Sequence, residues 1–325
     1  MMPPDINSLY KCLESPSKFG YEIEYFWISG IALVTIGFFG VIGNILSLIV
    51  LSQRLFRKKI FYSVLIVMAG FDIIVIVSYG VKVGYQSMVC RENFRKELGR
   101  ITYLFLNVGL TGSIYSTVAV SIERYLNICL PHHYRCSNNR IWMYITFIFI
   151  ITLTFNSPIF FEYHFYITNG TLVVEELSWA KSETYIAYYH FWAALFIDSI
   201  FPFLALSLLN GAILIRLKRS CKEKKNLTKS IDGMRKASTR ILFGIVGLFL
   251  VCHTPCVVWK FLYYLGCINC TTAEESDFRR KWYFITPIKK LFLVINSSLN
   301  FVLYCVMGTK FREEFIRLIN LINIK

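Results

Sequence analysis

The chain has 325 residues, of which 55% are hydrophobic and only 17% are charged, and its formal net charge is +15. A mean hydropathy of +0.52 exceeds that of ordinary soluble domains. These values argue against a soluble globular protein and favour a protein that is integral to a membrane.

Seven apolar segments follow one another along the chain, each long enough to cross about 30 Å of hydrocarbon as a helix. We expect spans at 26–52, 60–84, 98–129, 140–163, 186–217, 237–265 and 284–306. The predicted fold is an all-α membrane protein, a seven-transmembrane helix bundle over residues 24–306. An inverted-repeat transporter or channel is the main alternative, but an odd number of spans and the lack of an internal repeat argue against it.

The basic residues predict the orientation of the bundle. They gather after the first span, at Arg54, Arg57, Lys58 and Lys59, and after the fifth, between residues 216 and 240. Short basic loops face the cytoplasm, so residues 1–23 are predicted to be extracellular. Because the charge lies beside the membrane without an RNA-binding motif, we expect anionic lipid of the inner leaflet as its partner and no nucleic acid.

Asp72 lies in the middle of the second predicted span, where an ionisable group is costly and therefore a functional candidate. Other polar side chains of the first, third and seventh spans could reach it: Asn44, Ser113, Asn296, Ser297 and Asn300. Carboxylate, amide and hydroxyl groups at this depth suit a small hydrated cation or a proton. The alternative is that they form hydrogen bonds that hold the helices together.

Six motifs follow one another along the chain in the order, and at about the spacings, that one known protein family shows. They are "GNILSLIVLSQR" with Asn44, then Asp72, Glu123-Arg124-Tyr125, Pro202, "CHTP" with Pro255, and "NSSLNFVLYC" with Asn300 and Tyr304. On these motifs the chain resembles a rhodopsin-like (class A) G-protein-coupled receptor over nearly its whole length. Within that superfamily it is most similar to invertebrate FMRFamide-type neuropeptide receptors, on "GNILSLIVLSQR", "NSPIFFEY", "FPFLALSLLN" and "VINSSLNFVLYCVMGTKFREEF".

The resemblance implies a role for three groups of residues. Arg124, paired with Glu123 in the inactive state, would be released to meet the C-terminal helix of a heterotrimeric G protein when span six swings outward. The implied switch residues are Glu123, Arg124, Tyr125 and Tyr304, and the implied toggle residues are Phe249, His253 and Pro255. Asp72, Ser113, Asn296 and Asn300 would hold a sodium ion as an allosteric modulator, and no other cofactor is expected.

Three residues depart from the family pattern in the helices. His253 stands where most members have tryptophan, and it could sense protonation, although a neutral hydrogen-bonding role is the alternative. Phe301 replaces the usual proline of span seven, which predicts a less kinked helix. Arg235 stands at the foot of span six, where an acid often pairs with the switch arginine, and this predicts a looser inactive state.

The extracellular cysteines also depart from the family, which usually joins the top of span three to the second extracellular loop. Residues 162–190 contain no cysteine, and the four extracellular ones, Cys12, Cys90, Cys267 and Cys270, allow three pairings. We favour Cys267–Cys270 and Cys12–Cys90. Asn169, in "NGT", is predicted to be glycosylated because its loop faces the lumen.

Leu106 lies 18 residues before Arg124, where amine receptors carry an aspartate, so a small cationic amine is not expected. The outer part of the predicted bundle offers a candidate ligand set: Lys82, Tyr103, Asn107, Glu162, His190, Asp198, Trp259, Lys260, Tyr263, Lys289 and Lys290. Its acids suit the arginine or amino terminus of a short peptide, its aromatic rings suit phenylalanine, and its lysines suit an acidic or carbonyl-rich part.

We therefore predict a plasma-membrane, multi-pass receptor with an extracellular N-terminus, activated by a short FMRFamide-like neuropeptide and signalling through a heterotrimeric G protein. The alternatives are a chemosensory receptor for a non-peptide ligand and, from another class, a proton- or ion-moving transporter that uses Asp72 and His253. The five histidines form no metal or catalytic constellation, so an enzyme is not expected.

Residues 307–325 are predicted to form a short amphipathic helix on the inner leaflet and a cytoplasmic tail. Its apolar face would comprise Phe311, Phe315, Leu318 and Ile319, with Lys310, Arg312 and Arg317 near the interface. Because no serine or threonine follows Thr309, we expect weak arrestin recruitment that depends on the loop before span six. Its acceptors would be Ser220, Thr228, Ser230, Ser238 and Thr239.

Overall fold

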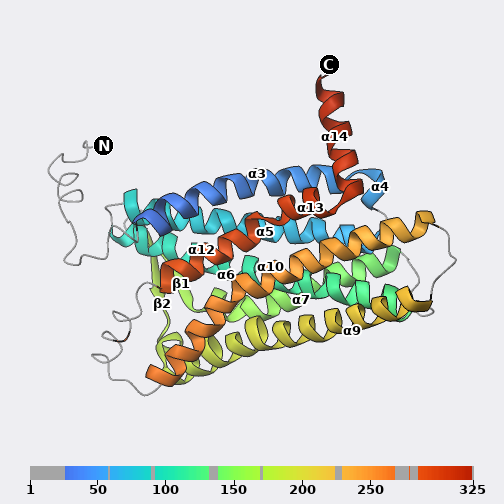
Figure 1. The fold of residues 1–325 in the computed structure, drawn as a ribbon. Coiled ribbons are helices and arrows are strands. Elements are labelled where there is room, and N and C mark those ends of the chain that lie inside the picture. The colour runs from blue at the N-terminus through green and yellow to red at the C-terminus, as the bar shows by residue number, and fades with distance from the viewer. Residues whose placement is uncertain are drawn as a thin grey trace.

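The computed structural model describes residues 26–57, 59–88, 92–131, 138–168, 171–223, 229–267, 278 and 285–323. The protein is an elongated bundle of long helices that run up and down between two ends (Figure 1). Loops and a small β-hairpin lie at one end, here called the hairpin end. The last helix lies at the opposite end, which is called the tail end.

The bundle contains the expected spans. The first is a π-helical stretch, η1 (Phe26–Ala32), that continues into α3 (Leu33–Leu51), and the next three are α5 (Ile60–Met88), α6 (Glu92–Cys129) and α7 (Asn138–Phe161). The fifth joins η3 (Ile186–Ala193), η4 (Phe196–Ile200) and α9 (Phe201–Glu223); the sixth is α10 (Lys229–Cys267), and the seventh joins α12 (Ile285–Ser298) to α13 (Asn300–Met307). Short turns α4 (Arg54–Arg57), η2 (Ser178–Lys181) and α8 (Glu183–Tyr185) connect them.

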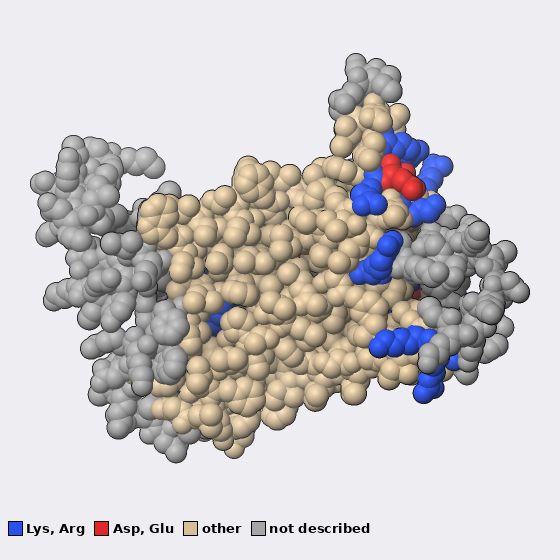
Figure 2. All heavy atoms as spheres, in the orientation of Figure 1, with Lys and Arg blue, Asp and Glu red and all other residues tan. Residues whose placement is uncertain are grey.

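The outer surface of the helices is apolar. Within the described parts of the chain, six helices are long and apolar enough to cross a membrane, and the bent pair α12 and α13 makes a seventh. Phe38, Leu208 and Val251 are each more than 60% exposed on this surface. Figure 2 shows an uncharged band along the bundle, with lysines and arginines gathered at the tail end. Such a band fits the hydrocarbon of a bilayer, and the predicted seven-span fold is confirmed.

Helix α6 lies at the centre of the bundle and packs against α5, α7, α9 and α10. Glycines permit its close approach to α5: a Cβ atom added at Gly112 would lie 2.4 Å from the ring of Phe71. The buried core of the tail-end half includes Leu65, Val118 and Phe249. Contacts with α6 therefore place residues of four neighbouring helices around one axis.

A β-hairpin that was not predicted from the sequence follows α7. Strand β1 (Tyr163–Thr168) pairs antiparallel with β2 (Thr171–Glu176), so that Tyr163 stands opposite Glu176 and Thr168 opposite Thr171. The sequence Asn169-Gly170 that joins the strands is a strong signal for a two-residue hairpin turn, and it could have revealed this element.

The prediction that span seven would be less kinked is wrong. The axes of α12 and α13 differ by 44° at Leu299, although residue 301 is a phenylalanine. The side chain of Asn44 donates a hydrogen bond of 2.8 Å to the backbone carbonyl of Ser297. A side chain that engages a helical carbonyl weakens the regular backbone ladder and allows a kink without proline.

The amphipathic helix after span seven is confirmed as α14 (Thr309–Asn323), which leaves the tail end of the bundle and points away from it, at an angle to the long helices (Figure 1). The ring of Phe311 is 1% exposed and lies 5.5 Å from that of Tyr304 and 5.9 Å from that of Phe301. Lys310, Arg312 and Arg317 are exposed, as the sequence pattern indicated. The turn at Gly308 is thereby fixed by packing of aromatic rings against span seven.

Candidate functional site

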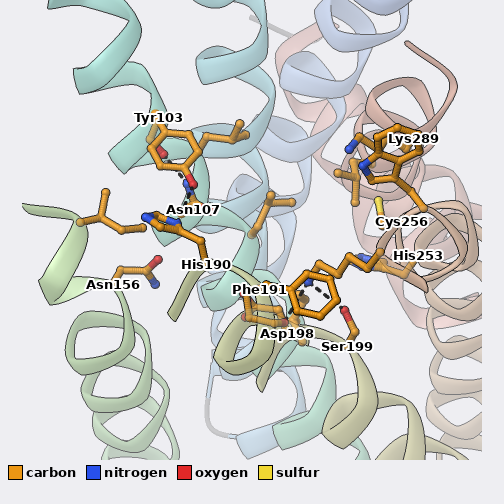
Figure 3. Close-up of a pocket in the computed structure, with 18 of the residues that line it drawn as sticks. Tyr103, Asn107, Asn156, His190, Phe191, Asp198, Ser199, His253, Cys256 and Lys289 are labelled. Carbon is orange, nitrogen blue, oxygen red and sulfur yellow. Dashed lines mark hydrogen bonds between the residues drawn. The ribbon is translucent and has the colours of Figure 1, made fainter. Parts of the chain in front are cut away.

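A cavity of about 530 Å³ opens between the outer halves of the helices, toward the hairpin end (Figure 3). Its volume lies within the range of about 300–1,000 Å³ that is typical of ligand sites. Ten of the eleven candidate ligand residues line it: Lys82, Tyr103, Asn107, His190, Asp198, Trp259, Lys260, Tyr263, Lys289 and Lys290. These residues come from five spans, so no short stretch of sequence contains the site.

One wall of the cavity carries polar groups of α6 and η3. Asn107 donates a hydrogen bond of 2.7 Å to the carbonyl of Tyr103, one turn earlier on α6, and the Tyr103 hydroxyl lies 3.5 Å from Nδ1 of His190 (Figure 3). Glu162 does not line the cavity. It is 3% exposed, and its Oε1 lies 3.0 Å from His190 Nε2 and accepts a 2.8 Å hydrogen bond from Tyr185. This carboxylate therefore orients residues of the wall.

Asp198 and Lys260 lie on the side formed by η4 and α10. Asp198 accepts a hydrogen bond of 3.1 Å from the hydroxyl of Thr111. Lys260 donates from Nζ to the carbonyl of Ala194 at 2.9 Å and to Ser199 Oγ at 3.3 Å. Ala194 lies between the two π-helical stretches, and irregular helical turns of this kind are frequent at functional sites.

Three further lysines line the cavity from α5 and α12. Lys289 Nζ lies 5.0 Å from the centre of the Trp259 ring, a distance at which a cation is attracted to the face of the ring. Lys82 and Lys290 are close enough to interact electrostatically. The labelled Lys289 stands across the cavity from Tyr103, Asn107 and His190 (Figure 3).

The implied toggle residues lie beneath the cavity. His253 is 6% exposed, lines the cavity, and stacks on Phe249 with 4.1 Å between ring centres and 26° between ring planes. Phe249 in turn lies 5.6 Å from the ring of Phe203 on α9. Pro255 lies within α10, two residues beyond His253. A ligand in the cavity would therefore reach the aromatic stack directly.

Several lining residues were missed by the sequence analysis: Tyr79, Asn156, Tyr189, Ser199 and Cys256. Helical periodicity could have found two of them, because Tyr79 is one turn before Lys82 and Cys256 is one turn before Lys260. For Tyr189 no such signal exists. Its hydroxyl donates a hydrogen bond of 2.6 Å to the carbonyl of Phe155 on α7, a contact that only the tertiary fold creates.

The hairpin is attached to α6 by an arginine. The guanidinium of Arg100 donates a hydrogen bond to the carbonyl of Val174 in β2 and lies 5.1 Å from the centre of the Tyr163 ring in β1. Burial raises the pKa of Tyr163 to about 12, with smaller contributions from Glu162 and Glu176, so its ring is neutral at ordinary pH. Arg100 thus holds both strands at the place where the family usually has a disulfide.

The predicted disulfide and glycosylation sites fall largely outside the described residues. This applies to Cys12, Cys90, Cys270 and Asn169, and Cys267 ends α10 with its side chain outside the described part. Arg235 lies in α10, but its side chain is likewise not described.

The polar cluster around Asp72 forms a connected group at the middle of the bundle. Ser113 Oγ donates to Asp72 Oδ1 and Asn300 Nδ2 donates to Asp72 Oδ2, both at 2.7 Å, and Asp72 is 0% exposed. Asn296 is buried but makes no hydrogen bond to Asp72 among the described residues. Asn44 Oδ1 is buried without a hydrogen-bond partner in the described part of the chain. These oxygen atoms are of the type that a hard cation such as sodium prefers.

The implied switch lies at the tail end of α6. Glu123 Oε2 and Arg124 Nε are 2.9 Å apart, and the guanidinium lies 3.8 Å from the centre of the Phe61 ring. Glu123 is 1% and Arg124 is 5% exposed. The hydroxyl of Tyr304 is buried without a hydrogen-bond partner among the described residues, and Tyr125 is half-buried. Because both residues are buried, separating them inside the bundle would leave two uncompensated charges. The ion pair therefore stabilises the arrangement seen in this structure.

Comparisons with known proteins agree with this arrangement. Residues 43–304 match the family described as 7 transmembrane receptor (rhodopsin family). The chain is 30% identical to an FMRFamide receptor of Drosophila melanogaster, over 97% of this chain and 58% of that protein. It is 23% identical to the FMRFamide peptide receptor frpr-18 of Caenorhabditis elegans (88% and 67% covered) and 24% identical to a type-1 angiotensin II receptor B of Rattus norvegicus (87% and 78% covered). The chain thus spans less than two thirds of the length of the Drosophila relative.

Proposed function

The chain belongs to the rhodopsin family of 7 transmembrane receptors, and from this premise we propose that it is activated by a short FMRFamide-like peptide and signals through a heterotrimeric G protein. Members of this family are receptors and not enzymes. The observation that carries the proposal is the cavity, which opens at the hairpin end and has the His253–Phe249 stack beneath it. Similarity to two FMRFamide receptors supports a peptide as the ligand.

The proposed mechanism is a population shift between a closed and an open bundle. A ligand that fits the cavity better when α10 has moved outward favours the open state by the ratio of its two affinities. In the closed state, Arg124 is held by Glu123 and covered by Phe61. In the open state it would contact the G protein.

The switch is tested by replacing Arg124 with alanine. Agonist-stimulated nucleotide exchange on the G protein should be lost at equal surface expression, because the contact of the open state is gone. The matched control is Arg216→Ala, since Arg216 is exposed on α9. Retained signalling in Arg124→Ala would contradict the switch role, and equal loss in both variants would assign the effect to basic charge in general.

We also propose that a sodium ion stabilises the closed state at Asp72, with Ser113, Asn296 and Asn300 supplying further oxygens. Asp72 already accepts hydrogen bonds from Ser113 and Asn300, which are both neutral donors. The ion would therefore bind the carboxylate of Asp72 alongside these two side chains. Linkage requires sodium to lower agonist affinity by the factor by which agonist lowers sodium affinity. Agonist affinity in membranes should fall as NaCl replaces a larger cation, and Asp72→Asn should abolish the response. A response of the same size in Asp72→Asn would contradict the site.

The orientation that we propose places the hairpin end outside the plasma membrane and the basic tail end against anionic lipid of the inner leaflet. Arrestin recruitment is proposed to depend on Ser220, Thr228 and Ser230 of the segment before span six. Two acceptors named from the sequence are corrected: Ser238 and Thr239 are 3% and 4% exposed in α10 and inaccessible to a kinase in this conformation. Alanine replacement of the three remaining residues should lower recruitment; unchanged recruitment would exclude them.

A further inference from the structure

Asp198 is the only carboxylate among the described residues that line the cavity. A positively charged group of a ligand therefore has one place in the described wall at which it can meet an opposite charge. Figure 3 shows Asp198 and Ser199 together at the side of the cavity that the fifth span forms. A cationic side chain of the ligand should be directed to this carboxylate.

The carboxylate of Asp198 can accept a second partner. Its Oδ1 accepts a hydrogen bond of 3.1 Å from Thr111, and its other oxygen makes no hydrogen bond to any described residue. An ionised carboxylate can accept about four hydrogen bonds. An arginine would bind it through two parallel N–H groups, which is the arrangement in which a guanidinium recognises a carboxylate best.

Lys260 supplies positive charge to Asp198 from the facing helix α10. Within the described part of the chain, its Nζ is hydrogen-bonded not to the carboxylate but to the carbonyl of Ala194, at 2.9 Å, and to Ser199 Oγ, at 3.3 Å. Lys260 thus balances the charge of Asp198 and also joins α10 to the fifth span. A second cation at Asp198 would balance that charge directly and, since like charges repel, would weaken the contact between the two helices.

The ordinary explanation for an acid and a lysine on facing helices is that they only hold the bundle together. That explanation predicts a direct ion pair, because a charge in a poorly hydrated place is most stable when it is hydrogen-bonded to its partner. Here the lysine binds a carbonyl and a hydroxyl, and Asp198 lines the cavity. The carboxylate is therefore available to a ligand.

We propose that Asp198 binds the arginine side chain of the peptide, and that this arginine replaces Lys260 as its counter-charge. The inference rests on the proposed function, which supplies an FMRFamide-like peptide. The phenylalanine that follows the arginine packs against the rings of Phe191 and Trp259, which line the same cavity. Because the bound arginine repels Lys260, peptide binding favours a state in which α10 is less tightly joined to the fifth span.

The test compares two amidated peptide libraries on the full-length receptor in nanodiscs. One has the form X-X-Arg-Phe-amide, in which X is any residue, and the other has citrulline, which is similar in shape to arginine but neutral. Retained peptides are identified by mass spectrometry, and the affinity of each is measured in its arginine and its citrulline form. We expect citrulline to lower the affinity about tenfold or more, the effect of one lost charge-assisted contact.

Two variants assign this difference to Asp198. In Asp198→Asn, which can still accept the hydrogen bond from Thr111, citrulline should lower the affinity less than about twofold, because the charged partner is gone. Citrulline peptides should bind this variant as well as they bind the wild type, which a loss of folding would not allow. Asp198→Glu keeps the charge and should keep the preference for arginine.

Lys260→Gln tests the replacement of the counter-charge. Without the competing ammonium, the ratio of the affinities for the arginine and citrulline forms should rise about twofold or more. Any effect of the variant that both forms share, such as a shift between closed and open receptor, cancels in this ratio. The control is Glu183→Gln, since Glu183 is exposed on α8 outside the cavity lining, and it should leave the ratio unchanged.

Each remaining outcome decides between the two proposals. Equal affinity for the two forms in the wild type, or an undiminished preference for arginine in Asp198→Asn, would overturn the inference and leave a peptide receptor standing. A ratio that falls or stays the same in Lys260→Gln would overturn the replacement of Lys260. Retention of no peptide from either library would overturn the proposed function together with the inference that depends on it.

Discussion

A hydrogen bond between α5 and α10 predicts how easily the bundle opens. The hydroxyls of Tyr62 and Ser238 lie 3.2 Å apart, and both residues are 3% exposed. Tyr62 follows Phe61, whose ring covers Arg124. If α10 moves outward in the active state, this bond exists only in the closed state. Tyr62→Phe should therefore raise signalling in the absence of ligand.

The size of the effect follows from the free energy of one buried hydrogen bond. A buried hydrogen bond between neutral groups contributes about 0.5–1.5 kcal/mol net, so its loss should lower the ratio of closed to open receptor about 2- to 13-fold. The ring of phenylalanine retains the packing of Tyr62, whose ring centre lies 4.7 Å from that of Phe56 and 5.0 Å from that of Phe61. The change in the equilibrium can then be assigned to the hydroxyl.

The assay is basal nucleotide exchange on the G protein at equal surface expression. Ser238→Ala should raise it to a similar degree, and the double variant should exceed neither single variant, because one shared bond can be lost only once. The control is Thr254→Ala, since Thr254 lies on α10 but donates its 2.6 Å hydrogen bond within the helix, to Leu250. Unchanged basal exchange in Tyr62→Phe, or additive effects in the double variant, would refute the reasoning.

Three further predictions concern the hairpin, the packing of α6 and the orientation. Arg100→Gln should increase hydrogen exchange in β1 and β2, because the bond to the Val174 carbonyl weakens; unchanged protection would exclude this role. Gly112→Ala should lower the free energy of unfolding by about 1–3 kcal/mol because the added Cβ would lie 2.4 Å from the Phe71 ring. A Cβ added at Gly70 would have no atom within 4 Å, so Gly70→Ala should have little effect. Asn169→Gln should abolish a glycosidase-sensitive shift in mobility; a shift that persists would place the glycan elsewhere.

The sequence predicted those features that depend on the cost of polar groups in a membrane. Apolar runs gave the spans, and Asp72 was singled out because a carboxylate at that depth needs partners. Ser113 and Asn300, two of the residues named for it, do bond to Asp72. The prediction worked because few polar side chains of the neighbouring spans lie at the same depth.

Features that depend on contacts between distant segments were harder to predict from the sequence. The kink in span seven was judged from the missing proline, whereas the structure relates it to Asn44, which bonds to a carbonyl 253 residues away. Likewise, Glu162 was assigned to the ligand from its sign alone. Whether a carboxylate is available depends on partners such as Tyr185 and His190, and the sequence does not show that they converge on it.

The arrangement of side chains assigns different tasks to α6 and α10. Both helices reach from the cavity to the tail end: α6 carries Asn107 and Arg124, and α10 carries Lys260, His253 and Ser238. Because α6 is central and its glycines are filled by α5, it cannot move without disturbing the core. Helix α10 also packs apolar side chains such as Ile241 and Leu242 into the core. Its contacts through Lys260, His253 and Ser238, in contrast, are polar bonds and one aromatic stack, which can be exchanged at smaller cost. Substitutions along α6 should therefore change stability, whereas those at the three α10 contacts should change the equilibrium between closed and open receptor.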